Sequence, residues 1–149
     1  MTDYDSTSPR DSLGFLIYRT ALALKAALQR FFKENGSRIT PEQWAIIRRL
    51  REEEGLSQRE IGEKVAKDKP NITRMLDALE KKRLIFRQAD PRDRRKYCIY
   101  LTKEGRQLHD LLAPLVVRLR QRATQGLAPE EIDLLTATLN KIYQNIGAD

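Results

Sequence analysis

The hydrophobic repeat of this chain changes from a helical to a strand-like period after Leu84, and this change restricts the fold more than any other feature. Before it, residues 57–67 and 69–84 carry apolar side chains at helical spacing, and a capping box of Ser57 and Glu60 starts the first segment. After it, apolar and polar residues alternate on both sides of the charged stretch ADPRDRRK. Two short helices joined by a tight turn and followed by a β-hairpin predict a helix-turn-helix with a wing.

Two helices are predicted ahead of this motif. The first follows a helical apolar repeat that begins at Leu13 and stops at Asn35-Gly36. The second begins at Thr40, which is a candidate N-cap, and Gln43 completes a capping box with it. Its core-facing residues are expected to be Trp44, Ile47 and Leu50.

Two further helices are predicted after the hairpin. Thr102 can cap a helix that ends at Gly126, and Pro114 within it predicts a kink or a missing hydrogen bond. A last helix is predicted over residues 128–146. Both carry apolar side chains at alternating spacings of three and four residues, which predicts seams for partner helices.

The positive charge of the chain is concentrated around the hairpin. The chain has a formal net charge of +7, and the window 81–106 holds ten Lys and Arg residues against three acids, so this window accounts for all of the excess. Such a footprint favours a polyanionic partner over a merely solvated charged face. Charge by itself leaves DNA, RNA and an anionic membrane open as partners.

Length and composition limit the class of protein. The chain has 149 residues, of which 40% are hydrophobic and 33% charged, as expected for one folded, helix-rich domain. No apolar run approaches the roughly 20 residues of a membrane span, and the polar residues 1–11, expected to be a flexible tail, lack a signal pattern. The single cysteine, Cys98, allows no internal disulfide. We therefore expect a cytoplasmic protein.

The order of these segments resembles the MarR family of winged helix-turn-helix transcription regulators over nearly the whole chain. The stretches LSQREIGEKVAKDKPNITRMLDALEKKRLI and, above all, DPRDRRKYCIYLTKEG carry the resemblance. It implies an α+β fold, mostly α, with a winged helix-turn-helix lobe at 37–102 and dimerisation helices at 12–36 and 103–149, in a single structural domain overall. It also implies a homodimeric, sequence-specific regulator of double-stranded DNA, a repressor that binds a pseudo-palindromic operator and is released by a small effector.

The resemblance assigns the second short helix to the major groove of DNA. Asn can pair with adenine, Arg with guanine, and Thr can offer a hydroxyl or a methyl group to a base edge. The expected recognition residues are Lys69, Pro70, Asn71, Thr73 and Arg74. Three residues at the start of the preceding helix, Ser57, Gln58 and Arg59, are expected to meet phosphates.

The resemblance assigns the hairpin tip to the minor groove. Arg95 matches the family arginine that enters the groove, and Asp93 matches the acid that orients it. Arg92, Arg94 and Lys96 are expected to contact phosphates. The alternative for Asp93 and Arg95 is an ordinary surface ion pair of little energetic value.

One position departs from the family pattern, and one site is a weaker inference. The family usually has Gly where this chain has Arg83, so either Arg83 adopts a left-handed conformation or the helix ends differently. Family members often bind a small aromatic or phenolic effector between the dimer helices and the DNA-binding lobe. Phe15, Tyr18 and His109 are the expected residues of such a pocket.

Two other function classes remain as alternatives. An RNA- or single-strand-binding module would need aromatic side chains exposed on one basic face, whereas Tyr97 and Tyr100 lie on opposite faces of one short strand. An enzyme would need a catalytic constellation, and the sequence offers neither that nor a metal-binding set, so no cofactor is expected. Comparing duplex with single-stranded binding would separate the first alternative.

Overall fold

The computed structural model describes residues 12–65 and 69–147. The expected tail at 1–11 and the helix end near Lys67 therefore lie outside the described residues. The chain divides after Val116 into two compact units, which are described separately below. No helix in the described ranges has both the length and the apolar character that a membrane crossing requires.

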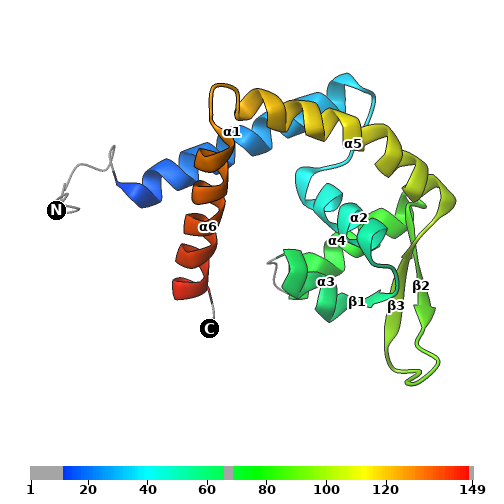
Figure 1. The fold of residues 1–149 in the computed structure, drawn as a ribbon. Coiled ribbons are helices and arrows are strands. Elements are labelled where there is room, and N and C mark those ends of the chain that lie inside the picture. The colour runs from blue at the N-terminus through cyan, green and yellow to red at the C-terminus, as the bar shows by residue number, and fades with distance from the viewer. Residues whose placement is uncertain (1–11, 66–68, 148–149) are drawn as a thin grey trace. The chain divides into compact units, whose positions relative to one another are not determined.

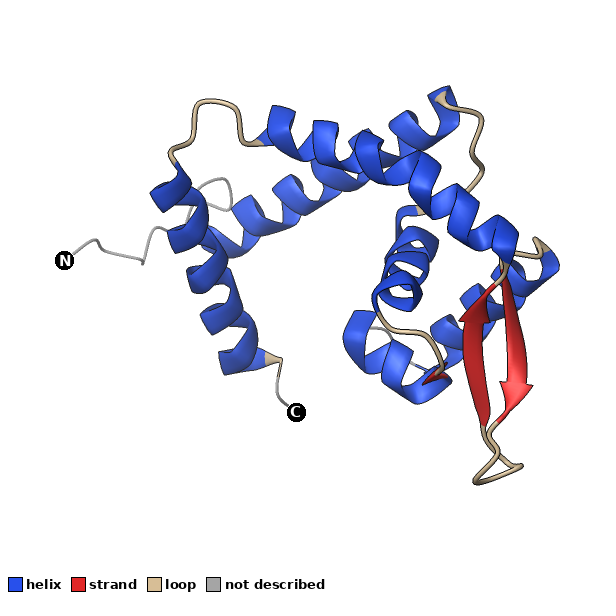
Figure 2. Ribbon diagram, turned by 45° about the vertical axis from the view of Figure 1, so that its right-hand side comes forward, coloured by secondary structure: helices blue, strands red, loops and turns tan. Residues whose placement is uncertain are grey.

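The architecture is mostly helical with one small sheet, which confirms the expected fold class (Figures 1 and 2). Within the described residues the elements follow in this order: α1 (Leu13–Glu34), α2 (Pro41–Glu52), β1 (Leu56–Ser57), α3 (Gln58–Val65), α4 (Lys69–Lys81), β2 (Ile85–Ala89), β3 (Tyr97–Leu101), α5 (Lys103–Ala123) and α6 (Pro129–Ile146). The second unit, residues 117–149, consists of the end of α5 and the whole of α6.

Side-chain caps start α2 and α3 at the positions that the sequence predicts. The Thr40 hydroxyl accepts the Gln43 backbone N–H at 3.1 Å, and the Gln43 side chain accepts the Thr40 N–H at 3.2 Å. The Glu60 N–H donates to the Ser57 hydroxyl at 3.2 Å, and the Glu60 carboxylate accepts the Ser57 N–H at 2.7 Å. Both capping boxes are thus confirmed, and a single cap of this kind contributes about 1 kcal/mol.

The sheet has three antiparallel strands in the order β1-β3-β2, shown in red in Figure 2. The predicted hairpin is confirmed, with Ile85 opposite Leu101 at its base and Ala89 opposite Tyr97 near its tip. The third strand, β1, is an addition that the sequence did not predict. It has only two residues, which is too short for a repeat to be recognised.

The core of the first unit lies between α2, the helix-turn-helix of α3 and α4, the base of the hairpin and the first half of α5, and Phe32 of α1 packs into it. Trp44, Ile47 and Leu50 are buried as predicted, and Ile46 is also fully buried. The other buried apolar residues are Phe32, Ile39, Leu56, Ile61, Ile72, Leu76, Leu79, Ile85, Ile99, Leu101, Leu112 and Leu115. The core therefore holds α4 and the hairpin base in one lobe.

The start of α5 is tied to the turn between α4 and β2. The Thr102 hydroxyl accepts the Gly105 N–H at 3.0 Å, as predicted for a cap, and also donates to the Arg83 carbonyl at 2.7 Å. The Thr102 N–H donates to the Leu84 carbonyl at 3.0 Å. Gly105 is buried against Leu84, so the two backbones approach closely at this point.

Arg83 takes the left-handed conformation, with φ of 59°, which decides between the two alternatives for this position. The Leu84 N–H donates to the Leu79 carbonyl at 3.0 Å, and the Arg83 N–H donates to the Glu80 carbonyl at 2.9 Å. These two bonds form the Schellman end of a helix, which normally places glycine where Arg83 stands. A non-glycine residue in this conformation carries backbone strain.

We expect Arg83→Gly to raise the free energy of unfolding by about 1 kcal/mol, because relief of left-handed strain outweighs the added freedom of the unfolded chain. Urea unfolding followed by circular dichroism measures this change. Arg83→Ala is the control, since it removes the charge but keeps the strain and should change the stability little. A lower urea midpoint for Arg83→Gly than for the wild type would contradict the expectation.

Candidate nucleic-acid interface

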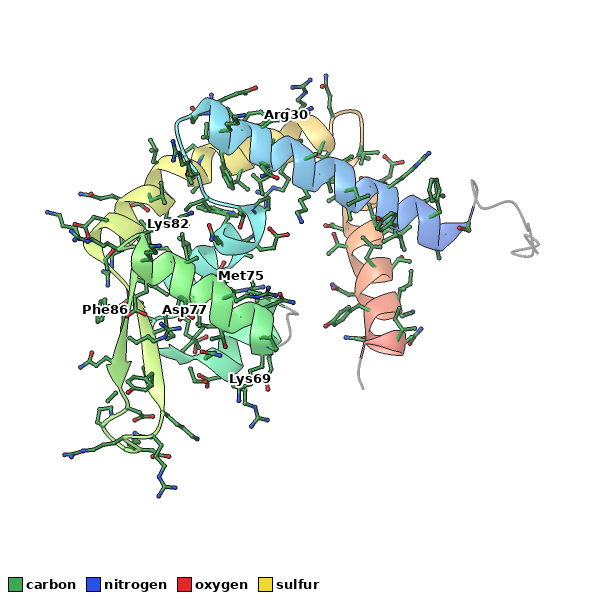
Figure 3. All side chains as sticks on the ribbon, turned by 180° about the vertical axis from the view of Figure 1, so that it is seen from behind. Arg30, Lys69, Met75, Asp77, Lys82 and Phe86 are labelled. Atoms are coloured by element: carbon green, nitrogen blue, oxygen red, sulfur yellow. The ribbon has the colours of Figure 1, made fainter. Side chains whose placement is uncertain are left out.

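The first turns of α4 expose polar side chains and bury apolar ones. Lys69, Pro70 and Arg74 are exposed, whereas Ile72 and Leu76 are at most 1% exposed. Figure 3 shows Lys69 at the start of α4, on the side of the lobe toward which the hairpin tip extends. The burial of Ile72 and Leu76 orients the helix about its axis, so that its polar face is open to a large ligand.

The polar residues of α4 are already linked to one another and to α3. The Arg74 guanidinium donates to the Asn71 side-chain oxygen. The Thr73 hydroxyl donates to the Lys69 carbonyl at 2.9 Å and accepts the Gln58 side-chain amide at 2.6 Å. Gln58 was expected to meet phosphate, and this bond occupies one of the two N–H groups of its amide. Sequence spacing offers no signal for this bond, because the two residues belong to different helices.

The start of α3 presents Ser57 and Arg59. The Arg59 side chain is 89% exposed and pairs with Glu63 on the same helix at 3.1 Å. The Ser57 backbone N–H, followed by its hydroxyl, holds the pKa of the Glu60 carboxyl below its usual value. Because the folded pKa is lowered, the stability from this cap is present at neutral pH and is lost as the pH falls through that lowered pKa.

The hairpin tip is shaped by two aspartates that bond to the backbone. Asp90 accepts the Arg92 N–H at 2.8 Å, and Asp93 accepts the Arg95 N–H at 3.0 Å. The Lys96 N–H donates to the Asp93 carbonyl at 2.9 Å. Each aspartate therefore forms a local turn of the kind that Asp and Asn side chains favour.

The cations of the tip are exposed and unpaired. Within residues 12–65 and 69–147, no ion pair involves Arg92, Arg94, Arg95 or Lys96, and all four are exposed. The contact expected between the carboxylate of Asp93 and the guanidinium of Arg95 is a contact to the Arg95 backbone instead. The surface ion pair considered as the alternative is not formed either. The tip thus offers a ligand four exposed positive charges that no ion pair in the described residues holds.

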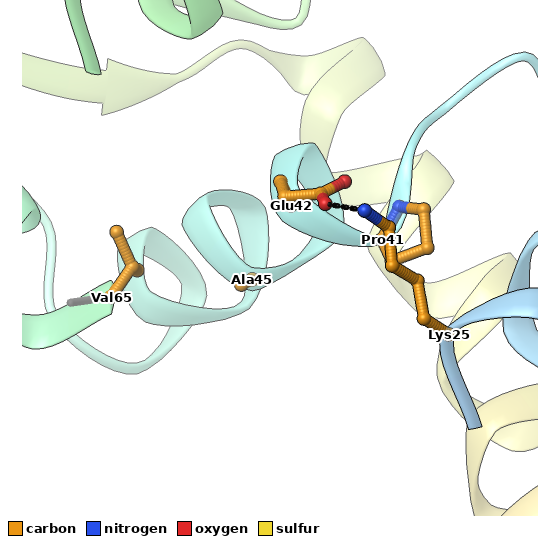
Figure 4. Close-up of a pocket in the computed structure, with 5 residues that line it drawn as sticks. All are labelled: Lys25, Pro41, Glu42, Ala45 and Val65. Atoms are coloured by element: carbon orange, nitrogen blue, oxygen red, sulfur yellow. Dashed lines mark ion pairs between the residues drawn. The ribbon is translucent and has the colours of Figure 1, made fainter. Parts of the chain in front are cut away.

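The expected effector residues do not line a pocket that the described residues form beside Lys25. A pocket of about 240 Å³ is lined by Lys25, Pro41, Glu42, Ala45 and Val65, and an ion pair joins Lys25 and Glu42 (Figure 4). Its walls come from α1, α2 and the end of α3. The residues that line the pocket are far apart in the sequence, so no local motif predicted it.

Phe15, Tyr18 and His109 have other surroundings. Phe15 is 40% exposed and Tyr18 is 62% exposed on α1, and the Arg19 guanidinium lies over the Phe15 ring. The His109 ring stacks on Trp44 with centroids 5.2 Å apart. A hydrogen bond from His109 holds the pKa of the Asp110 carboxyl below its usual value. Their role in effector binding stays a prediction.

Metal binding has no candidate site in the part of the chain that the structure describes. No three His, Cys, Asp or Glu side chains gather there in a way that could hold an ion. Cys98 is half-buried in β3 and is a free thiol. An exposed polar helix face and a tip of unpaired cations are therefore the features that define the candidate site.

The fold and this site define a winged helix-turn-helix protein, and comparisons with known proteins agree. The model of the MarR family matches residues 39–97. The chain is 30% identical to the uncharacterised helix-turn-helix transcriptional regulator YkoM of Bacillus subtilis, over 73% of this chain and 70% of that protein. It belongs to the MarR family of transcriptional regulators.

Solved structures of similar proteins share the whole fold. One is the PcaV transcriptional regulator of Streptomyces coelicolor in complex with its natural ligand, with a TM-score of 0.82 and 26% identity over 93% of this chain and 96% of that one. Another is the transcriptional repressor CouR bound to a 23-mer DNA duplex, with a TM-score of 0.82 and 28% identity over 95% of this chain and 99% of that one.

Proposed function

We propose that this protein binds a pseudo-palindromic operator in double-stranded DNA as a homodimer and represses transcription until a small molecule releases it. The observation that carries the proposal is the pairing of an exposed, polar α4 start with a tip of four unpaired cations on one lobe. A helix can enter the major groove while a charged tip reaches the flanking minor groove. The CouR repressor, a similar protein, was solved on a DNA duplex, which supports this proposal.

The arrangement of the aromatic side chains favours duplex DNA over a single strand. Single-strand binding relies on aromatic rings that lie open for stacking with bases. Here Phe86 and Tyr100 stack on each other with centroids 5.4 Å apart, and Tyr97 projects from the opposite face of the sheet. No row of open rings lies over the basic tip in the described residues.

Helices α1 and α6 each carry several exposed apolar side chains, and this supports a dimer. On α1 the exposed apolar residues are Leu13, Phe15, Leu16, Ile17, Tyr18, Leu22 and Leu24. On α6 they are Leu134, Leu135, Leu139, Tyr143 and Ile146. Many exposed apolar side chains on one helix mark an interaction site. We propose that a second copy of the chain covers it.

The residue roles follow from side-chain chemistry. Asn71, Thr73 and Arg74 would contact base edges. Lys69, next to Pro70 in the first turn of α4, would contact the phosphate backbone of the DNA. Ser57, Gln58 and Arg59 would contact phosphates of the same groove. Arg95 would enter the minor groove, with Arg92, Arg94 and Lys96 on the flanking phosphates. A regulator of this kind acts where the DNA is, so we place it in the cytoplasm. Because its role is to bind DNA, we assign it no catalytic activity.

Selection of operators from random duplexes, followed by footprinting, tests the proposal. We expect an inverted repeat whose half-sites lie about one helical turn apart, because two symmetric recognition helices on one face require that spacing. Competition with the single strands of the same operator should leave the complex intact. Protection of one unsymmetric half-site by a monomer, or preference for the single strand, would reject it.

Effector release is the second part of the proposal. The pocket beside Lys25 is the candidate site, because Pro41, Ala45 and Val65 give it apolar walls next to the Lys25 ammonium group. The similar proteins PcaV and CouR were solved with a natural ligand and with p-coumaroyl-CoA, respectively. Small aromatic and phenolic acids added to the operator complex should dissociate it in a saturable way. If a panel of such acids leaves the complex unchanged, the effector assignment is wrong while DNA binding stands.

The turn made by Asp93 leads to a prediction with an unusual sign. Asp93→Ala should weaken operator binding by about fivefold or more although it deletes a negative charge, because the carboxylate that shapes the backbone at Arg95 is lost. Asp93→Asn keeps the side-chain oxygen and should bind at least as tightly as the wild type. Titration at several salt concentrations measures both. Tighter binding by Asp93→Ala would mean that the tip acts only as a basic patch.

A further inference from the structure

Arg87 on β2 forms the only cluster of charges that joins the hairpin to α4 in the described chain. Its guanidinium donates to the Asp77 carboxylate at 2.7 Å and to the Glu80 carboxylate. The Arg87 side chain is 20% exposed, much less than the cations of the tip. Figure 3 shows Asp77 on the side of α4 that faces the hairpin.

This cluster restrains the orientation of β2 relative to α4 as well as the distance between them. A guanidinium is planar, and its nitrogens can bond two acceptors at fixed angles. Asp77 and Glu80 stand three residues apart on α4, so they are neighbours on one helix face. With both carboxylates engaged by one guanidinium, rotation of β2 relative to α4 would break at least one bond.

The position of the cluster makes this restraint relevant to DNA reading. The hairpin and α4 are joined through the short turn at Arg83 and Leu84, and the buried Ile85 anchors the hairpin base. Arg87 adds an attachment two residues farther toward the tip. The recognition residues lie at one end of α4 and the tip cations at the end of the hairpin. A small rotation at the base would therefore move the tip out of its groove.

Arg87 itself is poorly suited to contact DNA. Its guanidinium is occupied by two carboxylates and is largely covered, whereas Arg92, Arg94, Arg95 and Lys96 are exposed and unpaired. Moving it to a phosphate would leave Asp77 and Glu80 without their partner and close to a polyanion. Its charge is better used to neutralise these two acids on the helix that approaches DNA.

We propose that Arg87 is a positioning residue for operator recognition, which sets the hairpin at the angle to α4 at which Arg95 can enter the minor groove. This inference rests on the proposed function. It adds a residue that touches no DNA but decides how much the wing contributes to sequence preference. Energetic coupling between Arg87 and Arg95, which make no contact with each other, is its measurable consequence.

A double-mutant cycle tests the coupling on operators that differ only in their flanks. Arg95→Ala alone should weaken binding to the operator with A·T-rich flanks by about tenfold and reduce its preference over G·C-rich flanks. In an Arg87→Gln background, the same Arg95→Ala change should cost about twofold or less. Arg74→Ala is the control, because it acts from α4 and its effect should be equal in both backgrounds.

A second variant removes the same ion-pair cluster by changing its two acids on α4. Asp77→Asn combined with Glu80→Gln removes two negative charges near the DNA, so charge alone predicts tighter binding. The proposal predicts loss of the preference for A·T-rich flanks and a smaller effect of Arg95→Ala. Thermal unfolding of every variant accompanies the titrations, and the coupling is compared only at temperatures where all are folded.

The outcomes are distinct. Coupling of Arg95 to both Arg87 and the Asp77 and Glu80 pair, with Arg74 uncoupled, supports the proposal. Additive effects of Arg87→Gln and Arg95→Ala overturn it and leave the proposed function standing. If the unaltered protein binds no selected duplex, the proposed function fails and the inference fails with it.

Discussion

Gly105→Ala is expected to lower the free energy of unfolding by about 3 kcal/mol, at the upper end of what overpacking usually costs. A Cβ at this position would lie 2.1 Å from the Leu84 carbonyl oxygen and 3.2 Å from a Leu101 methyl carbon. The first neighbour is backbone and cannot swing aside. Relief of the clash would require α5 to move away from the α4–β2 turn, which would break the 3.0 Å bond from the Thr102 N–H to Leu84.

Urea unfolding of Gly105→Ala and of a matched variant, Gly14→Ala, measures the effect. Gly14 also lies within a helix but has no atom within 4 Å of the added Cβ, so the better helix propensity of alanine should stabilise the protein by up to about 1 kcal/mol there. The two substitutions are chemically identical and should have opposite signs. A Gly105→Ala protein as stable as the wild type would show that α5 does not pack against Leu84 as closely as described.

Charged substitutions on α6 are expected to separate the dimer and to weaken operator binding by about a hundredfold or more, because a monomer loses the second half-site. Leu135 and Leu139 are 52% and 39% exposed in the single chain, so glutamate at both positions opens no cavity within it. In a dimer, the same glutamates would be buried unpaired at the interface. Sedimentation velocity reports the change in mass, and a titration with the selected operator reports the loss of affinity.

Asn140→Glu is the control on the same helix, since it adds a charge at an exposed polar position. It should leave both the mass and the affinity unchanged. Should the double glutamate variant remain dimeric with full operator affinity, α6 would not lie in the dimer interface. A dimer with weak DNA binding would instead separate the assembly from the reading of the operator.

Local sequence determined the helices and the hairpin of the described residues, and the starts of α2 and α3. Thr40 with Gln43 and Ser57 with Glu60 start helices because a capping box is complete within four residues. The alternation from Tyr97 to Leu101 is also a local signal. It predicted a strand because successive side chains of a strand point to opposite faces. The concentration of charge in the hairpin, and the family signature within it, were likewise readable without a structure.

Tertiary structure decided the contacts between elements. Strand β1 exists because the exposed edge of β3 offers partners to Leu56 and Ser57. Local sequence allows two conformations for Arg83, and the left-handed one belongs to a helix end that Thr102 supports from 19 residues away. The bond from Gln58 to Thr73 and the cluster around Arg87 join residues of different elements.

Asp93 shows why the detailed role of a residue escaped even a specific signature. Its sequence neighbours suggested a partner for the Arg95 guanidinium, whereas its carboxylate bonds to the Arg95 backbone. The pocket beside Lys25 escaped because its walls come from three helices. Caps and repeats depend on residues within a turn of one another, so sequence determines them. Side-chain partners and cavities depend on how separate elements pack, and this is set only when the whole core forms.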